Sequence, residues 1–217
     1  SQTPEMVSRI GSVTKQFTST AILKLMEEGK LKLDDPITKF LPDYPTQGKT
    51  VTVWNLLNHT SGIKSYTSIE SNMTTENKAK NLTHAQLLGT FQNMPFDFNP
   101  GDQWLYNNSG YYLLGMIIEK VSGERFDQYV KHHVLDPLGL YGGYCVDSLD
   151  NSRFATIYEY NVDSAKFFAS PAAYAPRREE IAKYVMGYSA PIFSPTGGMK
   201  ITATDLARYM IMHMNYG

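Results

Sequence analysis

The sequence has little of three features that would point to a particular class of protein. It contains one cysteine, Cys145, which excludes an intramolecular disulfide and a cysteine cluster for a metal ion. No apolar run approaches the roughly 20 residues that a membrane-spanning helix needs. The net charge is −1 at pH 7, so electrostatics gives no reason to expect nucleic acid or an anionic membrane as a partner.

What remains is the composition of an ordinary globular protein. The 217 residues are 42% hydrophobic and 19% charged. The 15 tyrosines and 10 methionines are interpreted mainly as core and cleft lining. We see no internal repeat, low-complexity tract or linker, which predicts one domain over residues 1–217.

Helical periodicity dominates the chain. The first predicted helix runs from about Ser12 to Glu28, with apolar residues three and four positions apart and Gly29 as its left-handed cap. A second begins at Thr50 or Thr52 and stops at Gly62. Further helices are predicted after Thr83, from Ser109 to about Val121, within 125–139, and after Thr202 or Thr204. Residues 65–80 are predicted to form a surface loop, and 141–195 an irregular region with a hairpin.

One short motif suggests nucleophilic chemistry. Ser12 and Lys15 lie three residues apart at the start of the first predicted helix, so their side chains share a face. A serine hydroxyl becomes a good nucleophile only when a neighbouring base takes its proton. The pattern also occurs at Ser61 and Lys64, but Gly62 follows at once and no helix continues. The structural alternative is that Ser12 is a plain helix N-cap.

A second motif is the chain's only Tyr-x-Asn, Tyr106 to Asn108. It follows a turn-rich segment and directly precedes a predicted helix, a position from which a phenol and an amide can point into a cleft. A phenol becomes a proton shuttle if a nearby ammonium lowers its pKa from about 10. The structural alternative is a buried tyrosine beside a helix-capping asparagine.

Other candidate motifs are interpreted as structural. His59, Thr60 and Ser61 form a turn that we expect to cap the preceding helix, with lining of the cleft as the alternative. His132 and His133 are adjacent, so on a regular helix they point in different directions. No acidic cluster accompanies them, and no phosphate-binding glycine loop is present. We therefore expect neither a metal site nor a cofactor.

Four blocks of the sequence together resemble a known family. In order they are RIGSVTKQFTSTAILKLMEEGKLKLDDPITKFLPDY, VWNLLNHTSGI, NPGDQWLYNNSGYYLLGMIIEKVSG and SPTGGMKITATDLARYM. They resemble the serine β-lactamase and penicillin-binding-protein superfamily, and most closely its class C β-lactamase, D-alanyl-D-alanine carboxypeptidase and esterase branch. Ser-x-x-Lys belongs to this superfamily, and Tyr-x-Asn replaces the Ser-Asp-Asn of class A enzymes.

The resemblance implies a role for each site residue. Ser12 matches the nucleophile that forms an acyl-enzyme, and Lys15 matches the residue that shares its proton. Tyr106 matches the general base and acid for the leaving group, and Asn108 matches the amide that binds the lysine and the substrate. Which of Lys15 and Tyr106 is the base stays open. As a base at pH 7, Lys15 would need its pKa lowered by about 3 units from 10.4.

The resemblance also implies a fold. It is an α+β, β-lactamase/transpeptidase-like fold, of which this chain covers mainly the helical lobe and the nucleophile helix. The flanking strands of the antiparallel sheet, the third motif (Lys-Thr-Gly or His-x-Gly) and the second oxyanion donor are expected outside these residues. For that reason we expect little hydrolase activity from the 217 residues alone, and the absence of a visible signal peptide decides nothing. The family suggests a periplasmic or extracytoplasmic location.

Three interpretations compete. The first is a serine hydrolase acting on a β-lactam, a D-Ala-D-Ala peptide or a small ester. The second is a binding or sensor module that keeps the fold without turnover. The third, a helical domain with chance motifs, requires four ordered coincidences. The sequence leaves the substrate and the oligomeric state open; the expected partner is a small molecule or a peptide.

Overall fold

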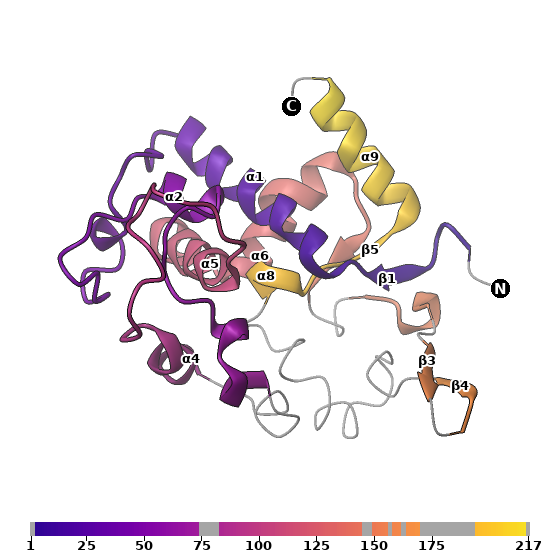
Figure 1. The fold of residues 1–217 in the computed structure, drawn as a ribbon. Helices are drawn as coiled ribbons and strands as arrows, with labels where there is room; N and C mark the ends of the chain where they lie inside the picture. Colours follow the sequence, from indigo (N-terminus) through magenta and orange to yellow (C-terminus); the bar gives the residue numbers. More distant parts are fainter. Residues whose placement is uncertain are drawn as a thin grey trace.

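The computed structural model describes residues 3–73, 83–144, 149–155, 158–161, 164–169 and 194–215. One side of the molecule is built from helices α1 (Thr14–Glu27), α2 (Val53–Leu57), α4 (His84–Phe91) and α5 (Asn108–Ser122). The other side holds strands β1 (Val7–Arg9) and β5 (Lys200–Thr202) and helix α9 (Ala203–Met214), as Figure 1 shows. The short helix α8 (Ser194–Gly197) lies between the two sides.

Helix α1 forms where the apolar periodicity predicts it. Its face of Phe17, Ala21, Ile22 and Leu25 is completely buried. A single 3₁₀ turn, Gly11–Val13, precedes it. Gly29 adopts φ +70° just beyond the C-terminus, the left-handed conformation that a glycine tolerates without steric cost. The predicted helix and its glycine cap are confirmed.

Helix α5 is the central helix of the helical side. Asn107 caps its N-terminus by accepting the backbone N–H of Gly110 at 2.9 Å, and Gly123 ends it at φ +77°. Gly115 is needed for packing, because a Cβ there would lie 2.1 Å from Cγ of Pro195 in α8. Helix α8 is also joined to α1, since the Thr18 hydroxyl donates to the Pro195 carbonyl at 2.8 Å. Helix α8 therefore bridges α1 and α5, although it lies far from both in the sequence.

The segment after α5 is helical as predicted but changes its hydrogen-bond pattern. Helix α6 (Phe126–Val130) continues as a π-helical stretch, Lys131–Leu135, and ends in the 3₁₀ turn Asp136–Leu138. The adjacent His132 and His133 both contact the Glu124 carboxylate, at 3.0 and 2.7 Å, and the ring of His133 also stacks on that of Tyr129.

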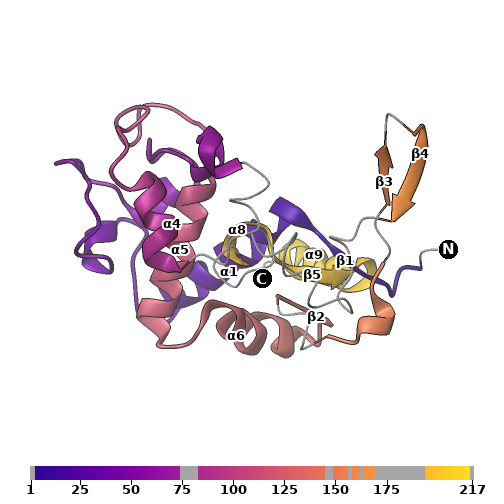
Figure 2. The ribbon, with the colours of Figure 1, turned by 90° about the horizontal axis from the view of Figure 1, so that it is seen from below.

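A small antiparallel sheet adds to the helical lobe. Its order is β1–β5–β2, where β2 is Gly142–Gly143, and Ser8 pairs with Ile201 in the register. These strands differ from the prediction, which placed the flanking strands of the antiparallel sheet outside these residues. The predicted hairpin is confirmed by β3 (Tyr158–Asn161) and β4 (Lys166–Ala169), which lie at the edge away from α4 and α5 (Figures 1 and 2). The fold is thus α+β, with the helical lobe predominant.

Two local predictions are wrong. Thr52 caps helix α2, as one alternative predicted, but the helix ends at Leu57 rather than near Gly62. Gly62 instead passes close to another loop, where a Cβ would lie 2.1 Å from the carbonyl oxygen of Phe98. The loop predicted from residue 65 starts as buried structure: Ser65 and Tyr66 are 5% and 6% exposed. Residues 74–80 of that loop, Cys145, and most of the tyrosine-rich region between 158 and 188 lie outside the described residues.

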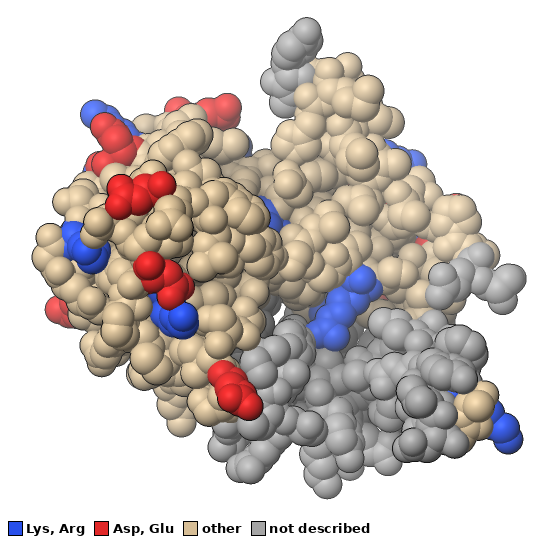
Figure 3. All heavy atoms as spheres, viewed as in Figure 1, with Lys and Arg blue, Asp and Glu red and all other residues tan. Residues whose placement is uncertain are grey.

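The face shown in Figure 3 carries no large charged patch among the described residues. On the face shown in Figure 3, acidic and basic side chains are scattered singly or in pairs over a mostly uncharged surface. Within the described ranges, none of the helices is both long enough and apolar enough to cross a bilayer.

Candidate functional site

Ser12 lies at the exposed end of α1, in the 3₁₀ turn that begins the helix. The turn is held in place from the opposite end of the chain. The backbone N–H of Ile10 donates to the Met199 carbonyl at 3.2 Å, and the N–H of Met199 donates to the Thr14 hydroxyl at 3.1 Å. Because both bonds flank Ser12, its hydroxyl is presented on a fixed backbone at the N-terminus of a helix.

Lys15 is buried beneath Ser12, with only 5% of its surface exposed. Its Nζ lies 2.8 Å from Oδ1 of Asn108, 2.8 Å from the carbonyl oxygen of Thr196 and 3.4 Å from Oγ of Ser12. An ammonium has three donors, and these three acceptors match them. No carboxylate is among the acceptors, so burial lowers the pKa of Lys15 to about 8.

Tyr106 approaches Ser12 from the loop that precedes α5. Its hydroxyl donates to Oγ of Ser12 at 2.7 Å, and its ring centroid lies 4.8 Å from Nζ of Lys15. The phenol, the serine and the amine therefore converge, although 94 residues separate Tyr106 from Ser12. The side chain is 39% exposed, so the site opens to solvent at this point.

The two consecutive asparagines have different partners. Asn107 is the helix cap, and its Nδ2 also donates to the Ile63 carbonyl. Asn108 faces the site: its Oδ1 accepts from Lys15, and its Nδ2 donates to the Thr67 hydroxyl at 2.9 Å. The two sequence interpretations of this motif, a capping residue and a site residue, are both present, one on each asparagine.

The structure separates the second Ser-x-x-Lys pair. Ser61 is 1% exposed, and its Oγ accepts the backbone N–H of Ile63. Lys64 instead forms an ion pair with Asp97 at 2.8 Å. The two side chains bind different partners, so this pair does not form a serine–amine unit.

Three further groups surround the site, and the sequence indicated only the last of them, as the alternative interpretation of its turn. The Thr196 carbonyl, which accepts from Lys15, has no sequence signal because every residue carries a carbonyl. The Ser65 hydroxyl accepts the backbone N–H of Asn108 at 3.2 Å, but Ser65 was assigned to a surface loop. His59 was interpreted as a cap of α2, yet its Nδ1 accepts the N–H of Asn107 and its ring lies 4.8 Å from that of Tyr106.

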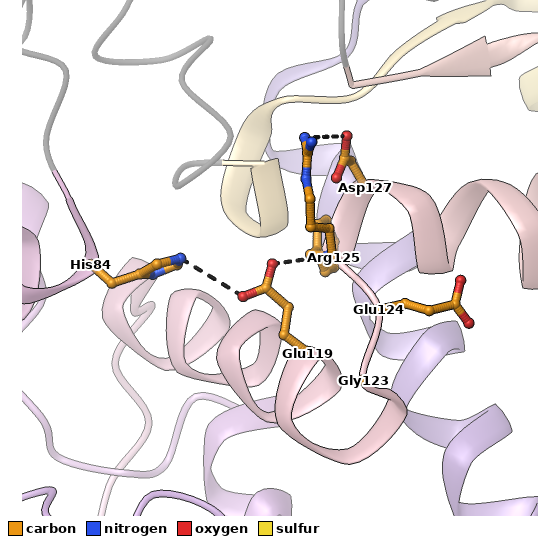
Figure 4. A pocket seen from close by; sticks show the side chains of 7 residues that line it. His84, Glu119, Gly123, Glu124, Arg125 and Asp127 are labelled. Atoms are coloured by element: carbon orange, nitrogen blue, oxygen red, sulfur yellow. Dashed lines mark hydrogen bonds and ion pairs between the residues drawn. The ribbon is translucent and has the colours of Figure 1, made fainter.

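A separate cavity of about 400 Å³ lies at the other end of α5, near the start of α6 (Figure 4). Its charged groups are largely satisfied by one another. Glu119 accepts the N–H of Phe126 at 2.9 Å and lies 3.7 Å from His84, and Arg125 pairs with Asp127 at 2.9 Å. None of the predicted site residues lines it. The part of the chain that the structure describes contains no group of three His, Cys, Asp or Glu residues placed to hold a metal ion.

Comparisons with known proteins show the family and the fold. Residues 2–216 match the family model described as Beta-lactamase. The chain is 40% identical over 131 residues to PbpX of Bacillus subtilis, which is named a penicillin-binding protein, and this match covers 60% of the chain and 31% of PbpX. The chain thus spans about a third of that relative's length.

Solved structures share the fold across nearly the whole chain. A penicillin-binding protein from Bacillus halodurans superposes with a TM-score of 0.76 at 27% identity, over 99% of this chain and 61% of that one. A D-stereospecific amidohydrolase from Streptomyces sp. gives 0.74 at 28% identity, over 95% and 60%. An octameric penicillin-binding-protein homologue from Pyrococcus abyssi gives 0.76 at 30% identity, over 99% and 46%.

Proposed function

The chain belongs to the Beta-lactamase family, and from this premise we propose that it is the helical part of a serine hydrolase that forms an acyl-enzyme on Ser12. The observation that carries the proposal is the convergence on Ser12 Oγ of the Tyr106 hydroxyl at 2.7 Å and the Lys15 amine at 3.4 Å. A nucleophile within reach of a base that is itself oriented by a third group is the arrangement that covalent catalysis requires. Asn108 is that third group, since it binds Lys15 at 2.8 Å.

The proposed reaction uses this group in both of its steps. Oγ of Ser12 attacks the substrate carbonyl, a C–O bond forms, and the serine proton passes to the Tyr106–Lys15 pair. The pair returns a proton to the leaving nitrogen or oxygen as its bond to the carbonyl carbon breaks, which leaves an ester on Ser12. Water then attacks that ester and gives a proton to the pair, and Ser12 recovers a proton as the acid departs.

Either member of the pair can hold the transferred proton. With a pKa of about 8, Lys15 is neutral in about a tenth of the molecules at pH 7. Tyr106 lies closer to Ser12 than Lys15 does. We propose that the serine proton passes to the two groups as a unit when the Lys15 amine is neutral; which of the two receives it first stays open.

The carbonyl oxygen needs donors where its charge develops. The backbone N–H of Ser12 lies at the N-terminal end of α1, where the helix dipole favours negative charge. We propose this N–H as one oxyanion donor; loss of such a donor typically costs about 3 kcal/mol of transition-state stabilisation. The proposed substrates are a β-lactam, a D-Ala-D-Ala peptide or a small ester. The names of the relatives support acyl transfer from an amide.

Covalent labelling tests the proposal. The protein is incubated with a fluorescent penicillin and, separately, with a fluorophosphonate, and the labelled residue is located by peptide mass spectrometry. We expect label on Ser12, none in Ser12→Ala, and unchanged labelling in Ser61→Ala, the serine of the other Ser-x-x-Lys pair. Absence of label from the folded wild-type protein would favour the alternative, a binding module of the same fold without turnover.

A further inference from the structure

His59 is held tightly against the loop that carries Tyr106. Its Nδ1 accepts the backbone N–H of Asn107 at 3.1 Å, and its carbonyl oxygen accepts the N–H of Leu105 at 3.0 Å. These two hydrogen bonds fix the backbone on both sides of Tyr106. The imidazole ring also lies 4.8 Å from the ring of Tyr106 and 5.1 Å from that of Tyr111.

The backbone of His59 is unusual as well. Its φ is +63°, the left-handed region that residues other than glycine, asparagine, aspartate and histidine rarely adopt. Such conformations persist where the surrounding structure over-determines them, and they cluster at functional sites. Within the turn that was predicted to cap α2, Thr60 makes the capping bond, since its N–H donates to the Asn55 carbonyl.

We propose that His59 is a positioning residue: its ring contacts both the Asn107 N–H and the Tyr106 ring and thereby fixes the phenol over Ser12. The inference rests on the proposed acylation of Ser12. Because the 2.7 Å contact between Tyr106 and Ser12 depends on where the loop lies, loss of the Nδ1 acceptor frees Asn107 and lets the phenol move. Displacement of a catalytic group by about 1 Å can cost roughly 100-fold in rate.

The role requires an imidazole without a proton on Nδ1. The titratable groups that face the ring are Lys15 from α1, Tyr106 from the loop and Tyr111 from α5. Burial, and then the positive charge of Lys15, lower the pKa of His59 to about 4. The ring therefore keeps its acceptor throughout the neutral range in which the hydrolase would act.

Two substitutions separate the acceptor from the ring. His59→Phe keeps an aromatic ring but has no acceptor, whereas His59→Asn places an amide oxygen near the Nδ1 position and tolerates the left-handed backbone. For labelling of Ser12 by a fluorophosphonate, we expect the maximal rate to fall at least 10-fold in His59→Phe, with a half-saturating concentration within about twofold of wild type. We expect His59→Asn to recover at least threefold of the loss. Wild-type labelling kinetics in a folded His59→Phe would overturn the proposal.

A spectroscopic measurement tests whether the His59 ring is buried at this position, and it does not depend on any reaction at Ser12. The chain has two tryptophans, and Trp104 contacts the His59 ring edge-on, with centroids 6.0 Å apart. In a Trp54→Phe background, we expect Trp104 fluorescence to titrate with a midpoint near pH 4, and this transition to vanish in Trp54→Phe/His59→Phe. Circular dichroism checks that the protein stays folded.

The two measurements separate failure of the inference from failure of the proposed function. A midpoint near 6.5, the ordinary histidine value, would show a solvated ring and would overturn the proposal even if Ser12 is acylated. If Ser12 of the wild-type protein takes no label but Trp104 fluorescence titrates near pH 4, the proposed hydrolase activity is contradicted, whereas the packing of His59 beside Trp104 is supported.

Discussion

Two consecutive asparagines make a matched test of the site at the scale of single residues. Asn107 caps α5 and also binds the Ile63 carbonyl, whereas Asn108 binds Lys15 and Thr67. We expect Asn107→Ala to lower the free energy of unfolding by about 1–3 kcal/mol, since it removes a cap and leaves a buried carbonyl without a partner. We expect Asn108→Ala to slow labelling of Ser12 by roughly 10- to 100-fold.

The measurements are urea unfolding and labelling rate for each variant. The prediction is that the two effects separate, with the larger stability loss in Asn107→Ala and the larger rate loss in Asn108→Ala. Equal rate losses in the two variants would show that Asn108 affects Ser12 only by supporting the start of α5.

Lys15 links the site to stability through its burial. Its pKa is lowered to about 8 in the folded protein, while the unfolded chain has the ordinary value near 10.5. Between these values the unfolded chain binds more protons than the folded one, so stability rises with pH across this window. Below pH 8 the burial penalty is complete, and above pH 10.5 it is gone. A shift of this size corresponds to roughly 3 kcal/mol.

We therefore expect the free energy of unfolding of the wild-type protein to rise by roughly 3 kcal/mol relative to that of Lys15→Met between pH 7 and pH 10.5. Urea unfolding of both proteins at several pH values measures the difference, in which the contributions of other titrating groups largely cancel. A difference that does not change with pH would mean that the amine is solvated rather than buried between α1 and α8.

At the scale of elements, α8 determines where the third acceptor of Lys15 lies. It fits against α5 only because residue 115 is glycine, since a Cβ would meet Pro195 at 2.1 Å. Displacing α8 would move the Thr196 carbonyl away from the Lys15 amine, which it now meets at 2.8 Å. Packing of an apparently remote helix thus controls the environment of the proposed base.

We expect Gly115→Ala to lower the free energy of unfolding by about 1–3 kcal/mol, as overpacking typically does, and to slow Ser12 labelling. Gly89→Ala in α4 is the matched control, because nothing lies within 4 Å of its added Cβ. For Gly89→Ala we expect the free energy of unfolding to rise by up to about 1 kcal/mol because alanine has the higher helix propensity, and we expect unchanged labelling of Ser12. Thermal unfolding and labelling of both variants measure these effects, and a harmless Gly115→Ala would contradict the role assigned to α8.

Helix starts were predictable from the sequence because capping is local. Thr52, Thr83 and Thr202 each accept the backbone N–H three residues later, a bond that needs no distant partner. Strands β1 and β5 were not predictable. They are three residues long, too short for a periodicity to show, and their pairing joins Ser8 to Ile201.

The candidate site shows the same division. The proximity of Ser12 and Lys15 follows from their spacing on a helix. That Tyr106 and Asn108 lie beside them was expected from the family resemblance and not from the residues alone. Neither route predicted the Thr196 carbonyl, since a backbone acceptor leaves no pattern in the sequence, and the place of His59 beside the site was only the alternative interpretation of its turn.

At the scale of the whole molecule, buried tyrosines link the core to alkaline stability. Burial raises the pKa of Tyr129 and Tyr209 to about 12. It raises the pKa in the same direction in four further tyrosines: Tyr44, Tyr111, Tyr112 and Tyr144. They come from the α1–α2 connection, α5, α6, the β2 region and α9, so they sample both sides of the fold. The folded protein holds these protons more tightly than the unfolded chain does, so stability is complete below pH 10 and falls as the pH rises toward 12.

We therefore expect a steep step in an alkaline titration that is followed by the ultraviolet absorbance of tyrosinate. The buried tyrosines ionise together in this step when the protein unfolds, and circular dichroism records the unfolding in parallel. Tyr144→Phe is the control: its hydroxyl is buried and has no hydrogen-bond partner among the described residues. The substitution should remove one tyrosine from the steep step without loss of stability at pH 7. A single smooth titration of all 15 tyrosines near pH 10, with the circular dichroism unchanged, would mean that water reaches the core that positions α1, α5 and α9.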